Sequence, residues 1–415
     1  MTGSKCRTAE DAVAVVKSGM TVGLGCIGAE PTDLTTALWA RGGELRDVTI
    51  LTGMLLTGYD FLTGPNAGAF RLRTWFMPGT LLSCSARDLR ADYLPLNWTQ
   101  TARMLAAAHI DVAFVQVSEA DAQGYHSLGI HVGQQLPMLR SAKLVVAEVN
   151  PRMPRTFGSA LVHESELDIL VRTDHPLIPF PHRDGDDIDR QVALNAAKHV
   201  PDGATLQFGI GGIPGAMLAE LQTLNRKHLT IYSQLSDPGI GLIESGACRQ
   251  DGPCCIIGEI LGTEDLYRWA DGRKDLRMAS AFETHTPNAL ARVENFVSVN
   301  SVLEIDLYGQ TNAETLGGRQ VGSTGGSSDF AIGAMFDGNL SVIALRATTK
   351  KGASRIVKQL PPGPVTAQRT LVQVVVSEFG SADLRGKTMR ERAEALAAIA
   401  HPDHREDLMR AAADF

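Results

Sequence analysis

Two glycine-rich turns contain residues whose types and spacing suit binding of an anion or a polarised carbonyl. The first is Phe208-Gly-Ile-Gly-Gly-Ile-Pro214, in which Gly209, Gly211 and Gly212 follow an apolar strand-like run and precede a helix-like run. Glycine lets the backbone approach a ligand closely, and the N–H groups at the start of the helix can face a negative charge. A strand-to-helix turn without a ligand has the same pattern, so both interpretations stay open.

The second turn is Gly322-Ser-Thr-Gly-Gly-Ser-Ser-Asp-Phe330, which precedes a helix-like run of small residues. Its central residues Gly325, Gly326 and Ser327 can bring main-chain donors onto a substrate oxygen. The alternative is an ordinary turn in which Asp329 caps the following helix.

A cluster of cations follows in the segment TTKKGASRIVKQL, which contains Lys350, Lys351, Arg355 and Lys358. Clustered cations near a glycine turn can hold the phosphates of a bulky cofactor. A solvated charged face is the other interpretation. The sequence has no Walker loop, no dinucleotide-binding glycine motif and no HExxH zinc motif, so nothing in it predicts a metal site.

The elements that must position these residues repeat along the chain. Segment 19–25 (GMTVGLG) and segment 203–209 (GATLQFG) share their glycine spacing, and each leads through a loop to a proline and an apolar helix-like run. A weaker echo pairs Gly124, after DVAFVQVS, with Gly309, after SVLEIDLY. Two similar halves explain both echoes. Short β-branched runs alternate with helical segments in each half, which predicts an α/β fold with largely parallel sheets.

The boundary between the halves is predicted in segment 173–189 (TDHPLIPFPHRDGDDID), which is rich in proline and charge and lacks a helical or strand period. We therefore expect an N-terminal domain over residues 1–185 and a C-terminal domain over 186–415 that carries the active site. The tail 388–413, interrupted at Pro402, predicts a pair of amphipathic helices with Arg and Glu outside.

Composition limits the function classes. The 415-residue chain has a formal net charge of −7, so it lacks the basic footprint expected for binding nucleic acid or an anionic membrane. Its longest apolar runs, such as 144–149 and 371–376, are far shorter than the roughly 20 residues of a membrane helix. The N-terminus has no signal-peptide core, which predicts a cytoplasmic protein. The six cysteines lack zinc spacing, so we expect reduced and mostly buried thiols.

Several long motifs resemble the acetyl-CoA hydrolase/transferase family, which includes 4-hydroxybutyrate and succinyl-CoA:acetate CoA-transferases. These motifs occur in the family's order along nearly the whole chain: segments 111–129, 145–168, 208–214, 298–314, 325–330 and 376–406. The resemblance implies two tandem CoA-transferase-like domains (the NagB/RpiA/CoA-transferase type) in an oligomer. It also implies covalent catalysis, in which a glutamate carboxylate attacks acyl-CoA and the resulting anhydride becomes a glutamyl-CoA thioester.

The sequence departs from this family pattern at the expected nucleophile. The family's His-Thr-Glu-x-x-Ser-Asp stretch corresponds here to Ile231-Tyr-Ser-Gln-Leu-Ser-Asp237. Matching on the final Ser-Asp places Ser233 at the glutamate position, and a one-residue slip places Gln234 there; neither side chain can form an acyl-glutamyl anhydride. The family's active-site asparagine falls on His285. Ser327 stands where many members have glutamine and other members have serine.

These departures lead to three hypotheses. In the first, Ser233 is a nucleophile activated by His285, with Glu283 or Asp329 orienting the imidazole and the Gly325 and Gly326 amides binding the oxyanion. The second keeps the family's chemistry with a relocated carboxylate, Glu244 or Glu304. The third is an inactive relative that only binds acyl-CoA or a carrier-bound acyl group.

The predicted function is acyl or CoA transfer, or thioester hydrolysis, with CoA as a substrate and no permanently bound cofactor. The cofactor contacts expected are Gly209, Gly211, Gly212 and the cations Lys350, Arg355 and Lys358. The expected partners are acyl-CoA and a small-molecule acceptor, with an acyl carrier protein as the alternative donor in a biosynthetic pathway. A homodimer or homotetramer is expected, without nucleic acid or membrane partners.

Overall fold

The structure is a computed structural model that describes residues 5–77, 81, 90–180 and 183–415. It divides into two compact units: unit 1 comprises residues 1–181 and 257–284, and unit 2 comprises residues 182–256 and 285–415. The chain enters unit 1 for the second time within strand β13 (Cys255–Ile260). The contiguous domains predicted from the sequence, 1–185 and 186–415, stay a prediction.

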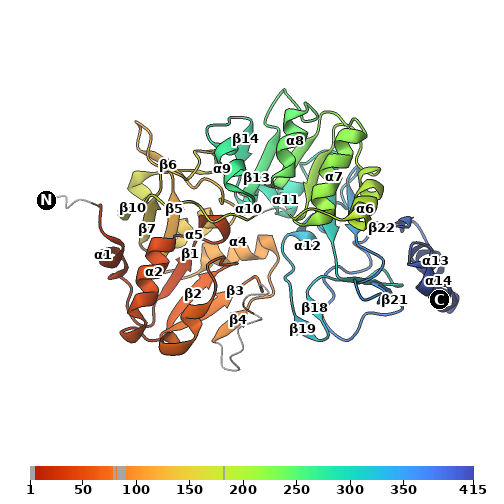
Figure 1. Ribbon diagram of the computed structural model, residues 1–415, viewed down its shortest axis with the longest axis horizontal. Coiled ribbons are helices and arrows are strands. Elements are labelled where there is room, and N and C mark those ends of the chain that lie inside the picture. Colours follow the sequence, from red (N-terminus) through yellow and green to blue (C-terminus); the bar gives the residue numbers. More distant parts are fainter. Residues whose placement is uncertain (1–4, 78–80, 82–89, 181–182) are drawn as a thin grey trace. The chain divides into compact units, whose positions relative to one another are not determined.

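Unit 1 is built on a fully parallel seven-stranded sheet (Figure 1). Its order is β10 (Ile169–Arg172), β7 (Val145–Val149), β5 (Val112–Val117), β1 (Thr21–Leu24), β2 (Val48–Thr52), β3 (Phe70–Thr74) and β4 (Ala91–Tyr93). Every residue of β5 and β7 is buried, which explains their nearly continuous apolar sequences. The helices of this unit include α1 (Ala9–Val13), α2 (Thr32–Ala40), α4 (Trp98–Ala107) and α5 (Gln135–Ser141).

Unit 2 repeats this plan. Its neighbouring strands are β23 (Gly380–Asp383), β22 (Val374–Ser377), β20 (Leu340–Ala344), β15 (Phe296–Ser301), β11 (Thr205–Phe208) and β12 (Thr230–Leu235). All pairs are parallel except β22 with β23. The helices used below are α6 (Asp187–Ala197), α7 (Gly212–Thr223), α8 (Pro238–Glu244), α12 (Ser327–Gly333), α13 (Met389–Ala398) and α14 (Pro402–Ala412). A small sheet contains β16 (Glu304–Asp306), β17 (Thr311–Asn312) and β21 (Ile356–Val357).

The two units have the same strand order around the repeated glycine segments. Strand β1 lies between β2 and β5, and β11 lies between β12 and β15. Each strand leads through a loop to a helix, α2 or α7. The second repeated feature, a glycine after an apolar run in each half, also has a structural cause. Gly124 (φ 81°) and Gly309 (φ 84°) both adopt the left-handed conformation that favours glycine. The α/β fold with largely parallel sheets, predicted from the sequence, is confirmed.

The predicted linker is shorter than expected. Helix α6 begins at Asp187, inside the predicted segment, because the Asp186 carboxylate accepts the N–H groups of Ile188 and Asp189, each at 3.1 Å. The acidic run that suggested a loop is therefore a helix N-cap. The C-terminal helix pair is confirmed as α13 and α14, and a capping box at Thr388 starts α13.

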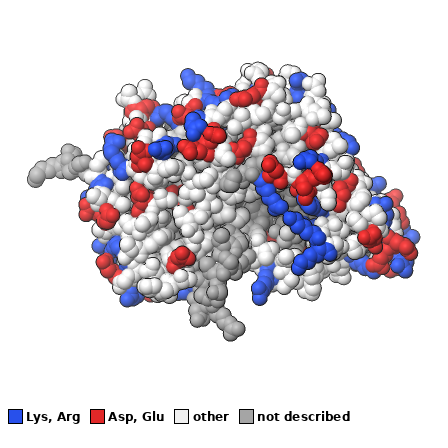
Figure 2. Space-filling view, viewed as in Figure 1, with Lys and Arg blue, Asp and Glu red and all other residues white. Residues whose placement is uncertain are grey.

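Charged side chains of both signs lie on the surface, and most of the described cysteines are buried. Figure 2 shows Lys and Arg side chains interspersed with Asp and Glu over the face it displays. Four of the free cysteines are buried, Cys6 is exposed, and Cys84 lies outside the described residues. In the described part of the chain, no helix combines the length and the apolar character needed to cross a membrane.

Candidate functional site

The carboxyl edge of the unit 2 sheet contains the residues at the predicted nucleophile position. Ligands of α/β proteins bind at this edge, where parallel strands end together. Ser233, near the end of β12, is 5% exposed and has φ of 77°, a left-handed conformation that is uncommon for any residue except glycine. Such strain costs on the order of 1–3 kcal/mol and concentrates at functional sites. The backbone of β12 therefore has an unusual conformation at the position where the sequence match predicts the family's nucleophile.

Gln234, the next residue, is half-buried and bridges two strands. Its amide Nε2 donates a hydrogen bond to the Phe208 carbonyl at 3.0 Å, at the end of β11. Close by in the sheet, the amides of Gln207 and Asn300 bond each other reciprocally at 3.3 and 3.0 Å. Neutral amides thus line this part of the edge. The Gln207–Asn300 pair was not found from the sequence, because the two residues are far apart along the chain.

His285 lies against the second glycine turn. Its ring is 2% exposed and packs on Phe330 with 4.6 Å between ring centroids. Burial lowers the pKa of His285 to about 3, so the imidazole is neutral at pH 7 and its protonated form is disfavoured. A Cβ at Gly326 would lie 2.9 Å from His285 Nε2, so this position has room only for glycine. The structure thus brings His285 and Gly326 together, as the first hypothesis requires.

Ser233 is linked to His285 through neighbouring side chains. Its neighbour Tyr232 packs with Leu290, Phe296 and Phe330, and Phe330 contacts His285. No hydrogen bond between the Ser233 and His285 side chains is seen among the described residues. The dyad stays a prediction, and catalytic hydrogen bonds often form only when substrate binds.

The other residues of the second glycine turn make contacts within the turn or its helix α12. Gly325 adopts φ of +55°, with open space where a side chain would lie. The Ser327 hydroxyl donates to the Thr324 carbonyl at 2.8 Å, which closes the turn before α12. Asp329, within α12, is buried, whereas Glu283 belongs to unit 1, where its carboxylate accepts the Ser280 N–H at 2.9 Å.

The first glycine turn follows β11 and precedes α7, as predicted, and Gly211 has φ of 120°. Gly212, however, is explained by packing. A Cβ there would lie 2.8 Å from Asp189 Oδ2, and Asp189 is paired with Arg346 at 2.7 Å. An acidic side chain therefore already lies at the start of α7. The cofactor-binding roles of Gly209, Gly211 and Gly212 stay predictions.

The predicted cations differ in whether they are free to bind an anionic ligand. Lys350 and Lys351 are exposed, and Lys358 is paired with Asp407 at 2.9 Å. Arg355 is half-buried, and its Nε has no hydrogen-bond partner among the described residues. Burial, with Arg346 nearby, lowers the pKa of Arg355. A desolvated guanidinium without a partner is the best anion receptor in this group.

We expect Arg355→Ala to raise the KM for acyl-CoA about tenfold, because one charge-assisted hydrogen bond contributes about 1.5–3 kcal/mol. Lys358→Ala is the matched control, since its ammonium is already paired with Asp407, and we expect a change of less than about twofold. Steady-state kinetics of both variants would check this. Equal effects of the two substitutions would contradict a specific role for Arg355.

The alternative carboxylates have different surroundings. Glu244 is an exposed residue at the end of α8. Glu304, at the start of β16, is half-buried and accepts a hydrogen bond from Asn312 Nδ2 at 3.3 Å. Neither lies on a strand of the main sheet.

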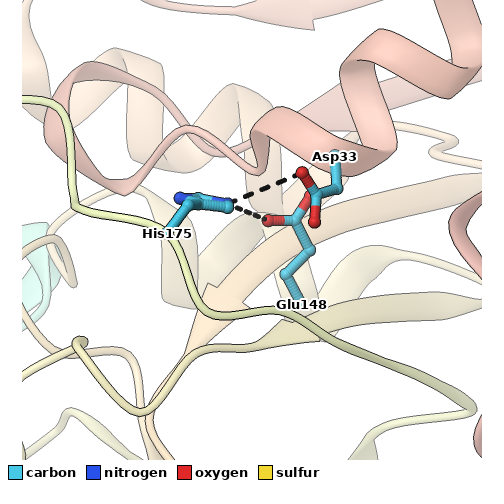
Figure 3. Close-up of side chains that lie close together, drawn as sticks. All are labelled: Asp33, Glu148 and His175. Atoms are coloured by element: carbon cyan, nitrogen blue, oxygen red, sulfur yellow. Dashed lines mark hydrogen bonds and ion pairs between the residues drawn. The ribbon is translucent and has the colours of Figure 1, made fainter.

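Unit 1 contains a second polar cluster that the sequence analysis missed (Figure 3). His175 Nε2 lies 3.3 Å from Glu148 Oε2 and 3.9 Å from Asp33 Oδ1, and Figure 3 shows this nitrogen facing both carboxylates. Glu148 is fully buried, and its other oxygen accepts the Leu34 N–H at 2.6 Å. The hydrogen bond to Glu148 raises the pKa of His175 to about 9. Burial raises the pKa of Glu148, and the hydrogen bond from His175 opposes that shift. The cluster therefore combines a charged imidazole at neutral pH with a buried carboxylate that depends on it.

Comparison with known proteins identifies the class. The family model described as the acetyl-CoA hydrolase/transferase N-terminal domain matches residues 3–181, and that of the C-terminal domain matches residues 262–412. The chain belongs to the acetyl-CoA hydrolase/transferase family and is an enzyme of the CoA-transferase and acyl-CoA hydrolase kind. The family predicted from the sequence motifs is thereby confirmed.

Individual relatives match along nearly the full length. The 4-hydroxybutyrate coenzyme A transferase of Clostridium kluyveri is 35% identical, with 98% of this chain and 96% of the relative covered. The succinyl-CoA:cyclohexane-1-carboxylate CoA transferase of Geobacter metallireducens is also 35% identical, with 97% and 93% covered. The crystal structure of RipA from Yersinia pestis superposes with a TM-score of 0.92 at 31% identity, with 99% and 97% covered.

Proposed function

We propose that this protein transfers or hydrolyses an acyl group that is bound as a thioester of CoA, with an acyl carrier protein as the alternative donor. The observation that carries the proposal is the match to named CoA-transferases over 97–98% of the chain. The unit 2 sheet edge adds a strained strand end and a glycine turn beside a neutral imidazole. The acceptor is water or a small carboxylate, amine or alcohol. A cytoplasmic homodimer or homotetramer completes the proposal.

In the proposed mechanism, Ser233 Oγ attacks the thioester carbonyl and His285 takes the hydroxyl proton. The C–S bond breaks, the CoA thiolate leaves with that proton, and a seryl ester remains. The acceptor then attacks the ester and regenerates Ser233. With a carboxylate acceptor the product is a mixed anhydride, which the CoA thiolate converts into the new acyl-CoA and a free acid. The N–H groups of Gly325 and Gly326 would stabilise the oxyanion in both steps, which typically contributes about 2.7–4 kcal/mol per donor.

The activity itself is tested by incubating the protein with a panel of acyl-CoAs and acyl carrier proteins, with and without acetate, and measuring released thiol and new acyl-CoA products. We expect thiol release or CoA exchange with at least one donor. No turnover with any acyl-CoA or acyl carrier protein would overturn the enzymatic proposal and favour a protein that only binds acyl-CoA.

For the nucleophile, we expect Ser233→Ala and His285→Ala each to lower kcat by about 10²–10³-fold, and the double variant to lose no more than either single one. Such non-additivity marks residues that act as one catalytic unit. Because His285 is buried, thermal unfolding and a His285→Gln variant would show whether the fold survives. Small, additive losses would indicate packing roles and contradict the dyad.

A further inference from the structure

A buried thiol in unit 1 lies at the same kind of sheet edge as Ser233 in unit 2. Cys26 follows β1, a central strand of the parallel sheet, and is 3% exposed. His131 and Glu259 reach it from two other segments of unit 1, joined by an antiparallel bridge between these two residues. All three side chains are almost fully buried.

These three side chains form a chain of contacts. Cys26 Sγ lies 3.7 Å from His131 Nδ1, and His131 Nε2 lies 3.9 Å from Glu259 Oε1. A thiol, an imidazole and a carboxyl group in this order match the arrangement of nucleophile, base and orienting group in covalent catalysis. His131 Nδ1 also lies 3.2 Å from the Cys26 carbonyl oxygen, so accepting the thiol proton requires the tautomer with hydrogen on Nε2, which faces Glu259.

Polar atoms around this group lack partners within the protein. His131 Nε2 and both amide atoms of Gln134 and Gln135 are buried without a hydrogen bond to any described residue. Each unpaired buried polar group costs about 1–3 kcal/mol. Native proteins satisfy such groups with protein atoms, water or a ligand, so a cluster of them indicates a place where polar molecules can bind.

Backbone N–H groups and glycines lie close around the sulfur. The N–H groups of Gly53 and Met54 are directed at Cys26 Sγ and favour its thiolate. A Cβ at Gly53 would lie 3.2 Å from the sulfur, and a Cβ at Gly25 would lie 3.2 Å from the Gln135 amide. A Cβ at Gly133 would clash with Glu259 Oε1. Glycine at these positions therefore keeps side chains out of the polar group.

The three side chains are mostly uncharged in the resting protein. Burial raises the pKa of Cys26 to about 12 and lowers that of His131 to about 4, so the resting pair is a thiol and a neutral imidazole. Burial also raises the pKa of Glu259 to about 8, so this carboxyl group is mostly protonated at pH 7. Because a thiolate–imidazolium pair is disfavoured here, the thiol proton has to move to His131 while the new C–S bond forms.

We propose that Cys26 is an acyl-accepting thiol that exchanges with acyl-CoA thioesters, with His131 as its base and Glu259 as a positioning residue. This inference rests on the proposed use of acyl-CoA. The Cys26 sulfur attacks the acyl carbonyl, a new C–S bond forms, and the bond to the CoA sulfur breaks. The thiol proton moves through His131 to the departing CoA thiolate. One thioester is exchanged for another, so no further reactant is needed.

The test is intact-protein mass spectrometry after incubation with acetyl-CoA and butyryl-CoA, followed by peptide mapping at acidic pH. We expect an acyl adduct on Cys26 that neutral hydroxylamine removes, as it does for thioesters. Cys26→Ser should remove at least about nine-tenths of this adduct, and His131→Gln should slow its formation about 100-fold. Cys248→Ala, which removes an equally buried thiol of unit 2, should change neither.

The role of Glu259 is tested separately with two variants. Because its carboxyl group is mostly uncharged, Glu259→Gln should keep most of the acylation rate, whereas Glu259→Leu should lose it in a protein with an unchanged melting temperature. Equal losses in both variants would contradict a positioning role that depends on the polar end of the Glu259 side chain.

The outcomes separate this inference from the proposed function. CoA release at the same rate in the wild type and Cys26→Ser, with no acyl group on Cys26, overturns the inference and leaves the function standing. Acyl groups found on the exposed Cys6 or on Ser233 but never on Cys26 also overturn it. Acyl-Cys26 that accumulates without turnover supports the inference and contradicts the proposed turnover. Neither an adduct nor CoA release contradicts both.

Discussion

We expect Gln234→Glu to raise CoA transfer from acyl-CoA to acetate about 100-fold, equivalent to about 2.7 kcal/mol of transition-state stabilisation. The family resemblance implies a glutamate nucleophile at or next to this position, and Gln234 has the length of a glutamate but no carboxylate. Its amide now donates to the Phe208 carbonyl at 3.0 Å. A carboxylate cannot make this bond and is repelled by the carbonyl oxygen, so the new side chain should turn away from β11 and be free to attack a thioester.

The reaction of this variant leaves a specific trace. The carboxylate attacks acyl-CoA and expels the CoA thiolate; the thiolate then attacks the glutamyl carbonyl of the anhydride and releases the free acid. The product is an enzyme–CoA thioester, which intact-protein mass spectrometry detects and borohydride reduces to an alcohol. Gln234→Met, of similar size and without a carboxylate, is the control. No CoA adduct on the variant would contradict the placement of Gln234 at the nucleophile position.

Much of the fold follows from local sequence patterns. The glycine segments at 19–25 and 203–209 mark equivalent central strands, β1 and β11, because such turns have a short-range cause in backbone conformation. The C-terminal helices were also predictable, since their apolar period and caps are local. The linker end was misplaced because an N-cap run of aspartates and a charged loop have the same composition.

The polar clusters depend on long-range pairing and are harder to predict. Cys26, His131 and Glu259 come from three distant segments, and no single segment shows that their side chains meet. One signal was available, because Glu148 and Glu259 are carboxylates inside apolar strand runs, β7 and β13. A buried carboxylate needs a partner, so each such residue indicates a polar cluster even where its partner cannot be named.

We expect His175→Ala to lower the free energy of unfolding of unit 1 by about 2–3 kcal/mol at pH 6, because it leaves the buried Glu148 without its counter-charge. The pKa of His175 is raised to about 9 from an ordinary value of 6.5. Protonation therefore favours the folded state, and the stabilisation is fully present below pH 6.5 and is lost as pH rises through 9. The penalty of His175→Ala should accordingly become small at pH 9.5.

This stability change can be measured in the full chain, because all four tryptophans (Trp39, Trp75, Trp98 and Trp269) lie in unit 1. Urea unfolding followed by tryptophan fluorescence thus reports this unit at pH 6 and pH 9.5. In a double-mutant cycle, Glu148→Gln should remove most of the effect of His175→Ala, since the buried charge is then absent. A penalty that is the same at both pH values, or unchanged by Glu148→Gln, would mean that His175 stabilises unit 1 by packing rather than by its charge.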